Sequence, residues 1–430
     1  MIAANRLNLL ASVQDLPRDL QLLFLSLFLW TFGLGLYNYI WPLYLKDLDA
    51  TPSDIGLVFS IGFLAVALTM IPGGILANKY ELKALLIIGW AMGIPPPLMY
   101  YFARSWFDVI PGVILLQVSA FNLPAFYAYI AGASSREKRA TNFGITWASF
   151  PLGLVFSPLV GSALVSLIPV RQIFLLTFIF FTVSTFFLFF MKPQPPLVRN
   201  PQTPRLEVPR SRKEGTLLLY LVGAAIAYSV TIPFIPLYLH DTVGLQPPII
   251  QLLGAGQALG AAVFGIILGR RADAHSRGGA IALGLASSSI GLFGVLLARN
   301  PFFLAPMVFL IGGARAPSPI AYSILSTNRH DASRAGQYGF YLTLENLGFV
   351  AGSSVGGFLY TRDPTIVFYT TSALFLALAI LAALGFRGRG GSAPVESKSE
   401  PVSLGSSPTA KSLERHADSV PFGQFVHVGA

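Results

Sequence analysis

Twelve long apolar segments constrain what this chain can fold into. Segments near the length that a helix needs to cross a bilayer, about 20 apolar residues, lie at 20–45, 54–77, 83–103, 108–131, 141–166, 171–191, 216–239, 248–269, 278–298, 301–325, 335–360 and 364–386. Only 11% of the 430 residues are charged, too few to cover soluble domains, so a soluble enzyme and a nucleic-acid binder are excluded despite the net charge of +10. We predict an all-α membrane protein with twelve transmembrane helices.

The positions of Lys and Arg predict the orientation. If the N-terminus lies inside, 23 of the 29 Lys and Arg residues fall in cytoplasmic segments, five fall in outer loops, and Arg315 lies within a span. Basic residues gather on the cytoplasmic side of membrane proteins, so we expect a multi-pass protein of the cell membrane with both termini in the cytoplasm. The first segment carries Trp30, Trp41 and Pro42 without a following cleavage site, and therefore does not resemble a signal peptide.

Composition divides the chain into five parts. Residues 1–19 form a cytoplasmic N-terminus, and 20–191 and 216–386 form two six-helix bundles. The linker 192–215 is rich in Pro and charge, which predicts an extended, solvated connection. The tail 387–430 is rich in Ser, Pro and Gly, which predicts disorder.

The two predicted bundles repeat one sequence pattern. Residues 42–47 read PLYLKD at the end of the first span, and residues 236–241 read PLYLHD at the end of the seventh, 194 residues later. At an offset of 195, Gly74, Pro124 and Gly153 match Gly269, Pro319 and Gly348. Six spans in each half give both halves the same orientation. A parallel repeat of this kind is typical of transporters with a substrate site near the midplane between the halves.

The loop after the second span carries Gly74, Ala77, Asn78 and Lys79, and Gly269, Ala272 and Asp273 echo it in the second half. On this motif and the repeat, residues 18–390 resemble the major facilitator superfamily. The resemblance implies two six-helix bundles related by a pseudo-two-fold axis. It also implies a cytoplasmic gate at Gly74, Asn78, Lys79, Arg139, Arg270, Asp273 and Arg334. Asn78 stands where the family usually has an acid, so we expect this gate to rest on hydrogen bonds more than on charge.

The fifth span carries Gly144, Gly153, Pro158 and Gly161, a spacing similar to the signature of the family's antiporters, which are mainly drug exporters. Close helix packing explains the same pattern, because small residues four apart let a neighbouring backbone approach. Drug antiporters of the family usually have an Arg three residues before a Gln in span four, and here Ile114 precedes Gln117. The pattern favours export but lacks this part of the drug-antiport machinery.

Two charged residues lie deep within spans, Arg315 and Glu345, at about the same predicted depth. Ionisable groups at such depth are costly and usually functional. We hypothesise that both face the central cavity and interact, with Glu345 exchanging a proton while Arg315 alternates between this carboxylate and an anionic or polar substrate. The alternative is a static ion pair that joins spans ten and eleven.

Other polar residues of the spans are candidates for the cavity wall: Tyr37, Asn38, Gln117, Asn122, Tyr228, Gln257 and Asn346. Sparse polar groups among aromatic ones suit a small organic solute that is amphiphilic or weakly polar. Each of these residues also fits a helix–helix hydrogen bond or an interfacial anchor.

Several kinds of chemistry lack their sequence signature. There is no nucleotide-binding P-loop motif, no catalytic triad motif, and no metal-ligand spacing among the five His residues. We do not expect an enzyme, a bound metal or a cofactor. We expect a proton gradient as the energy source. The prediction is a monomeric secondary transporter that needs no ATPase subunit and exports a small organic solute by proton-coupled antiport. The alternatives are proton-coupled uptake of a sugar or organic anion, and a sensor or lipid-handling scaffold without transport.

Overall fold

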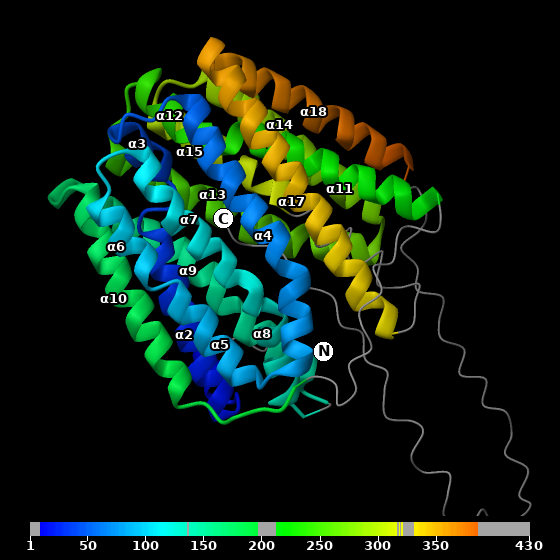
Figure 1. The fold of residues 1–430 in the computed structure, drawn as a ribbon. Coiled ribbons are helices and arrows are strands. Elements are labelled where there is room, and N and C mark those ends of the chain that lie inside the picture. Colours follow the sequence, from blue (N-terminus) through cyan, green and yellow to red (C-terminus); the bar gives the residue numbers. More distant parts are fainter. Residues whose placement is uncertain are drawn as a thin grey trace, which may run out of the picture.

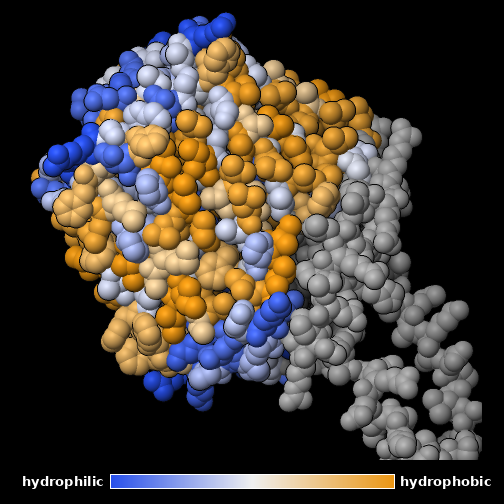
Figure 2. Space-filling view, viewed as in Figure 1, coloured by the Kyte–Doolittle hydropathy of each residue, from blue (hydrophilic) through white to orange (hydrophobic). Residues whose placement is uncertain are grey.

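The computed structural model describes residues 9–135, 137–196, 212–315, 318, 320 and 331–385, and within these ranges the ordered elements are helices, without a β-strand (Figure 1). Nine helices of the described chain are long and apolar enough to cross a membrane, and Pro301–Arg315 is a shorter apolar helix. Figure 2 shows a broad apolar surface between two polar ends of the molecule. The predicted all-α membrane fold is confirmed.

The six predicted spans of the first half are helical in the structure. After α1 (Leu9–Gln14), its elements are α2 (Arg18–Gly35), α3 (Trp41–Asp47), α4 (Pro52–Lys79), α5 (Leu82–Met92), α6 (Pro95–Phe102), η1 (Trp106–Val109), α7 (Ile110–Val118), η2 (Ser119–Asn122), α8 (Leu123–Gly132), α9 (Arg139–Leu167) and α10 (Val170–Phe189). Three of the predicted spans are therefore built from shorter helical pieces in series. Prolines at the starts of α6, α7 and α8 coincide with these interruptions, because proline lacks the donor of a continuous helix.

The second half repeats this order. Its elements are α11 (Arg212–Thr231), η3 (Ile232–Phe234), α12 (Ile235–Asp241), α13 (Pro247–Ala274), α14 (Arg277–Leu297), α15 (Pro301–Ile311), η4 (Gly312–Arg315), α17 (Asp331–Arg362) and α18 (Pro364–Gly385). The end of the predicted tenth span, residues 321–325, lies outside the described residues, as do most of the predicted linker and the whole tail.

The PLYLKD repeat marks equivalent breaks in the two halves. In the first half, five turn residues, 36–40, separate α2 from α3. In the second half, the 3-10 turn η3 separates α11 from α12. Pro42 and Pro236 each lie in the first turn of the short helix that follows. The sequence repeat is therefore a repeat of helix breaks, which bring the ends of both spans to the same face.

We call the face with the ends of α4, α13 and α10 the linker face. The face with α3, α12 and the starts of α4 and α13 is the opposite face.

Near the opposite face, α4 packs along α17 (Figure 1). The Ser60 hydroxyl lies 2.8 Å from that of Ser354, and the Ser53 hydroxyl lies 3.1 Å from that of Thr361. A Cβ atom on Gly357 would lie 2.6 Å from the Pro52 carbonyl oxygen, so the two backbones are in contact. We call this the α4–α17 seam.

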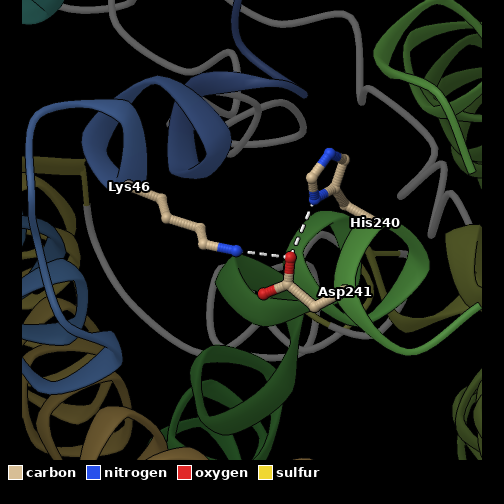
Figure 3. Close-up of polar contacts among 3 residues, drawn as sticks. All are labelled: Lys46, His240 and Asp241. Carbon is tan, nitrogen blue, oxygen red and sulfur yellow. Dashed lines mark hydrogen bonds and ion pairs between the residues drawn. The ribbon is translucent and has the colours of Figure 1, made fainter. Parts of the chain in front are cut away.

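A second seam joins α9 to α13 at the same face, where the Ser162 hydroxyl donates to the Pro248 carbonyl at 2.7 Å. Between the seams, Lys46 Nζ lies 2.6 Å from Asp241 Oδ1, and His240 Nδ1 lies 2.8 Å from the same oxygen. Figure 3 shows the Lys46 and His240 side chains reaching Asp241 from two sides. These contacts connect the two halves and close the opposite face.

The ion pair joins the two copies of the repeat, because Lys46 is the fifth residue of the first PLYLKD segment and Asp241 is the last residue of its counterpart. Burial raises the pKa of the neighbouring Asp47 above its ordinary value, against the opposing influence of His240 and Lys46. Both partners of the ion pair are accessible to water, so its contribution is small compared with that of the buried seams.

Candidate functional site

A cavity of about 230 Å³ lies within the first half and is bordered by α17 of the second half. Trp41 and Tyr100 line it toward the opposite face, and Tyr127 and Trp147 line it toward the linker face. From the second half, Leu342, Asn346 and Phe349 contribute to the wall. The cavity therefore extends along the middle of the membrane, below the closed seams.

Aromatic rings form most of the wall in the first half. The cluster comprises Trp30, Trp90, Phe126, Tyr127, Trp147 and Phe150. The rings of Trp147 and Phe150 are nearly parallel at 5.4 Å, and the Trp90 indole N–H donates to Ser184 Oγ at 3.1 Å. Because these rings are held by one another and by such bonds, the wall is preformed for flat or apolar groups.

Four amide side chains are the main polar groups of the wall: Asn38, Gln117, Asn122 and Asn346. Two of them donate to a carbonyl of their own helix, Asn122 to Ser119 and Asn346 to Leu342. The described residues that line the cavity include no acidic or basic side chain. Amides both donate and accept without charge, so the cavity suits a neutral solute with hydroxyl, carbonyl or amide groups.

The structure thus brings together five of the seven predicted wall residues, namely Tyr37, Asn38, Gln117, Asn122 and Asn346. Tyr228 and Gln257 are not among the described lining residues. The Tyr228 ring lies behind the wall, 6.1 Å from the ring of Phe349. Gln257 lies in α13, and its Oε1 is buried without a hydrogen-bond partner among the described residues.

The two deep charges also lie behind the wall. Glu345 is 1% exposed, and its Oε1 accepts a hydrogen bond from Ser318 Oγ at 2.8 Å. The Arg315 guanidinium lies over the Tyr228 ring, 4.7 Å from its centre. Neither charge is among the described cavity-lining residues, whereas their repeat counterparts in the first half, Ala120 and Phe150, are. The expected pairing of Arg315 with Glu345 remains a prediction.

A chain of rings joins this charged region to the cavity. Arg315 lies over Tyr228, Tyr228 meets Phe349 edge-on, and Phe349 stacks on Phe63 of α4 at 4.9 Å. Phe349 and Phe63 both line the cavity. Glu345 lies directly before the lining residue Asn346 and four residues before Phe349, on α17. A solute that moves the Phe349 ring would therefore also disturb the surroundings of Arg315 and Glu345.

The predicted gate residues fall on helix ends at the linker face. Gly74, Asn78 and Lys79 lie in the last turns of α4, Arg270 lies near the end of α13, and Arg139 begins α9. The Arg139 Nε atom is buried without a hydrogen-bond partner among the described residues. The side chains of Asp273 and Arg334 lie outside the described residues. The gate itself remains a prediction.

The glycines of the antiporter-like motif differ in their surroundings. A Cβ atom on Gly153 would meet the Thr31 hydroxyl and lie 2.9 Å from the Phe32 backbone nitrogen, so α9 contacts the α2 backbone there. On Gly161 it would lie 2.7 Å from the Leu36 carbonyl oxygen. For Gly144, no atom of the described residues outside the local helix backbone lies within 4 Å of this position, and Pro158 lies within α9. Close packing explains Gly153 and Gly161 but not Gly144.

We predict that Gly153→Val lowers the free energy of unfolding by about 1–3 kcal/mol, because the added methyl groups force α9 away from α2. The matched control is Gly144→Ala, where the added atom has open space. Thermal unfolding of the purified proteins in detergent measures both. Equal midpoints for the two variants would show that the close approach at Gly153 contributes nothing.

The sequence analysis missed most of the aromatic wall. Trp30, Trp90 and Trp147 each lie well inside a span, whereas Trp in membrane proteins is enriched at the two interfaces. Their position within the spans rather than at the span ends is the signal that could have identified them. Nothing in the sequence identified Ser318 as the partner of Glu345, or the pairing of Lys46 with Asp241.

Comparisons with known proteins agree with this architecture. A family model described as Major Facilitator Superfamily matches residues 23–222 and 217–428. The chain is 23% identical over 378 residues to the proton-coupled antiporter flippase LtaA of Staphylococcus epidermidis, covering 84% of this chain and 93% of LtaA. It is 24% identical over 377 residues to the LtaA of Staphylococcus aureus strain N315, covering 84% of this chain and 92% of LtaA.

Two solved structures share the fold. A mutant of the nucleoside transporter NupG matches with a TM-score of 0.70 and 14% identity, covering 85% of this chain and 99% of NupG. The human organic anion transporter MFSD10 matches with a TM-score of 0.63 and 16% identity, covering 85% and 100%. Because the family model matches both halves, and the helices, the repeat and the cavity follow the same plan, the chain belongs to the Major Facilitator Superfamily and is a secondary transporter.

Proposed function

We propose that this transporter is a proton-coupled antiporter that exports a small, uncharged amphiphilic solute. The observation that carries the proposal is an uncharged aromatic and amide cavity with a buried carboxylate directly behind its wall. The rings would hold the apolar part of the solute, and the amides its polar groups. The proton-coupled antiporter named among the relatives, at 23% identity, supports the coupling.

Glu345 would be the proton site. Its carboxylate is enclosed by protein at mid-membrane depth and accepts a hydrogen bond from Ser318. A single carboxylate in such a place can be occupied by a proton in one conformation and release it in another. The ring chain through Phe349 would make solute binding and protonation depend on each other, because both change the packing around α17.

In the proposed orientation, both termini lie in the cytoplasm and the opposite face is the outer face, as the distribution of Lys and Arg favours. The structure then corresponds to a state closed toward the outside. The two halves would rock so that the seams open outward, release the solute and admit a proton. A proton gradient would supply the energy, with the transporter acting as a monomer without an ATPase subunit, bound metal or cofactor.

The test is accumulation of radiolabelled solutes in vesicles that contain the purified protein, measured with and without an imposed pH gradient. The panel comprises neutral amphiphiles, organic cations, organic anions and sugars. We expect gradient-driven movement of a neutral amphiphile. Equal movement with and without the gradient would contradict the coupling, and movement of organic anions or sugars alone would contradict the proposed solute class.

Movement of a lipid is the second candidate, favoured because the LtaA relatives are named as flippases. A fluorescent lipid in the same vesicles distinguishes the two. Transfer of the lipid between leaflets under a pH gradient, without movement of any soluble amphiphile, would favour the lipid.

Gln117→Leu is expected to raise the KM for a neutral solute about tenfold, because the lost hydrogen bonds of one amide amount to about 1–2 kcal/mol. Gln117 lines the cavity, whereas Ile114 one turn earlier is 40% exposed on the outside of the helix. Ile114→Leu is therefore the matched control and should retain the native KM. An unchanged KM in Gln117→Leu would show that this amide does not bind the solute.

A further inference from the structure

One buried side chain joins the two halves at the break in the first span. Gln251 lies in the second turn of α13 and is 0% exposed. Its Nε2 donates to two carbonyl oxygens of the other half, to Gly35 at 2.9 Å and to Leu36 at 3.0 Å. These are the residues at which α2 ends and the break 36–40 begins.

The helix break explains why these carbonyls need a donor. In a continuous helix, Gly35 and Leu36 would accept from the backbone N–H groups of residues 39 and 40. Here the Ile40 N–H donates to the Tyr37 carbonyl instead. An unsatisfied carbonyl at membrane depth is costly, because no water is available to replace the lost bond. One amide from the opposite half supplies both bonds.

Two glycines shape the socket around this contact. A Cβ atom on Gly161 would lie 2.8 Å from Gln251 Nε2 and 2.7 Å from the Leu36 carbonyl oxygen. A Cβ atom on Gly254 would collide with the Tyr39 ring. Both glycines therefore leave room for residues of the break to lie against the other half.

The orientation of the amide is determined by its partners. Carbonyl oxygens only accept, so the NH2 end of Gln251 must face them. Its Oε1 is buried without a hydrogen-bond partner among the described residues. At the repeat offset of 195, α4 has Gly56 at the corresponding position. The contact thus belongs to the α9–α13 seam and has no amide counterpart in the α4–α17 seam.

We infer that Gln251 is a positioning residue that couples closure of the opposite face to the shape of the substrate cavity. The break it holds carries Tyr37 and Asn38, which line the cavity, and the seam it belongs to must separate when that face opens. Opening therefore releases the break and changes the wall that contacts the solute. The link to the solute rests on the proposed function, whereas the link to closure does not.

The test measures opening directly, by labelling one cysteine in the seam. The chain contains no cysteine, so Ser162→Cys gives a single reporter whose native hydroxyl bonds to Pro248 across the seam. The reporter is placed in the otherwise native protein and in Gln251→Leu, which keeps the bulk of the side chain but lacks the donor. The vesicles are oriented so that the opposite face of the protein points outward, and an impermeant maleimide is added outside.

We expect labelling to be about tenfold faster with Gln251→Leu, because loss of two buried hydrogen bonds favours the open state. We also expect a raised KM at a thermal midpoint close to that of the native protein. Leu252→Ala, at a neighbouring position 49% exposed on the outside of the helix, is the matched control. Unchanged labelling in a folded Gln251→Leu protein would overturn the inference.

A second variant tests the inference if Gln251→Leu does not fold. Gly161→Ala keeps the glutamine but adds an atom too close to both its Nε2 and the Leu36 carbonyl oxygen, and it should also speed labelling. Native labelling in this variant would also overturn the inference. Faster labelling in a protein that moves none of the tested solutes would support the role of Gln251 in closure and contradict the proposed function instead.

Discussion

A disulfide between cysteines placed at Ser53 and Thr361 is expected to stop transport almost completely. The two hydroxyl oxygens lie 3.1 Å apart across the α4–α17 seam, one in each half. Side chains at such close range can form a disulfide with little backbone movement. Because the opposite face opens only when the seams separate, the covalent link would hold the transporter closed on that side.

Oxidised and reduced samples of the double variant are compared in the same vesicles. The chain has no other cysteine, so any change on oxidation belongs to this pair, and reduction should restore the native rate. The controls are both single-cysteine variants and a pair at Ser26 and Ser184, whose hydroxyls lie 3.0 Å apart within the first half. Native transport by a fully cross-linked Ser53–Thr361 protein would show that the seam does not open during the cycle.

Glu345→Gln is expected to abolish accumulation driven by a pH gradient while leaving solute exchange between the two sides. Glutamine keeps the size of the side chain and can still hydrogen-bond with Ser318, which contacts Oε1 at 2.8 Å in the native protein. It cannot take up or release a proton. We expect at least a hundredfold loss of gradient-driven accumulation, the lower end of the effect typical for removal of a proton-transfer group, about 10²–10⁴.

The same substitution at an exposed acid provides the control. Glu137 lies on the linker face and is exposed, so Glu137→Gln should accumulate solute as the native protein does. Native, pH-dependent accumulation by Glu345→Gln would identify Glu345 as a structural acid. Loss of both accumulation and exchange, together with a lowered thermal midpoint, would also favour the structural ion pair over the coupling role.

The fold was predictable because the bilayer imposes it. A span needs about 20 apolar residues with all backbone bonds satisfied internally, and this requirement is visible in hydropathy alone. The breaks inside the spans were harder to locate. Pro42 and Pro236 mark two of them, and the sequence showed their repeat without showing that α2 stops at Gly35. The break depends on a donor, Gln251, that is 215 residues away in sequence from Leu36.

The candidate site was only partly predictable for a related reason. Polar residues within spans, such as Asn38 and Gln117, stand out because they are costly in lipid. Aromatic residues such as Trp147 and Phe150 cost nothing there, so their gathering around one cavity depends on tertiary packing. The repeat equates Glu345 with Phe150, but only the structure shows that the second lines the cavity while the first lies behind it.

The central claim is that movement of an uncharged solute in one direction drives protons in the other. Vesicles that contain the purified protein and a pH-sensitive dye measure it most directly, with the solute that moves best in the panel added on one side. We predict a pH change that requires the solute and is absent with Glu345→Gln. Its sign should show that protons move in the direction opposite to the solute. Solute movement without any pH change in the native protein would contradict the account.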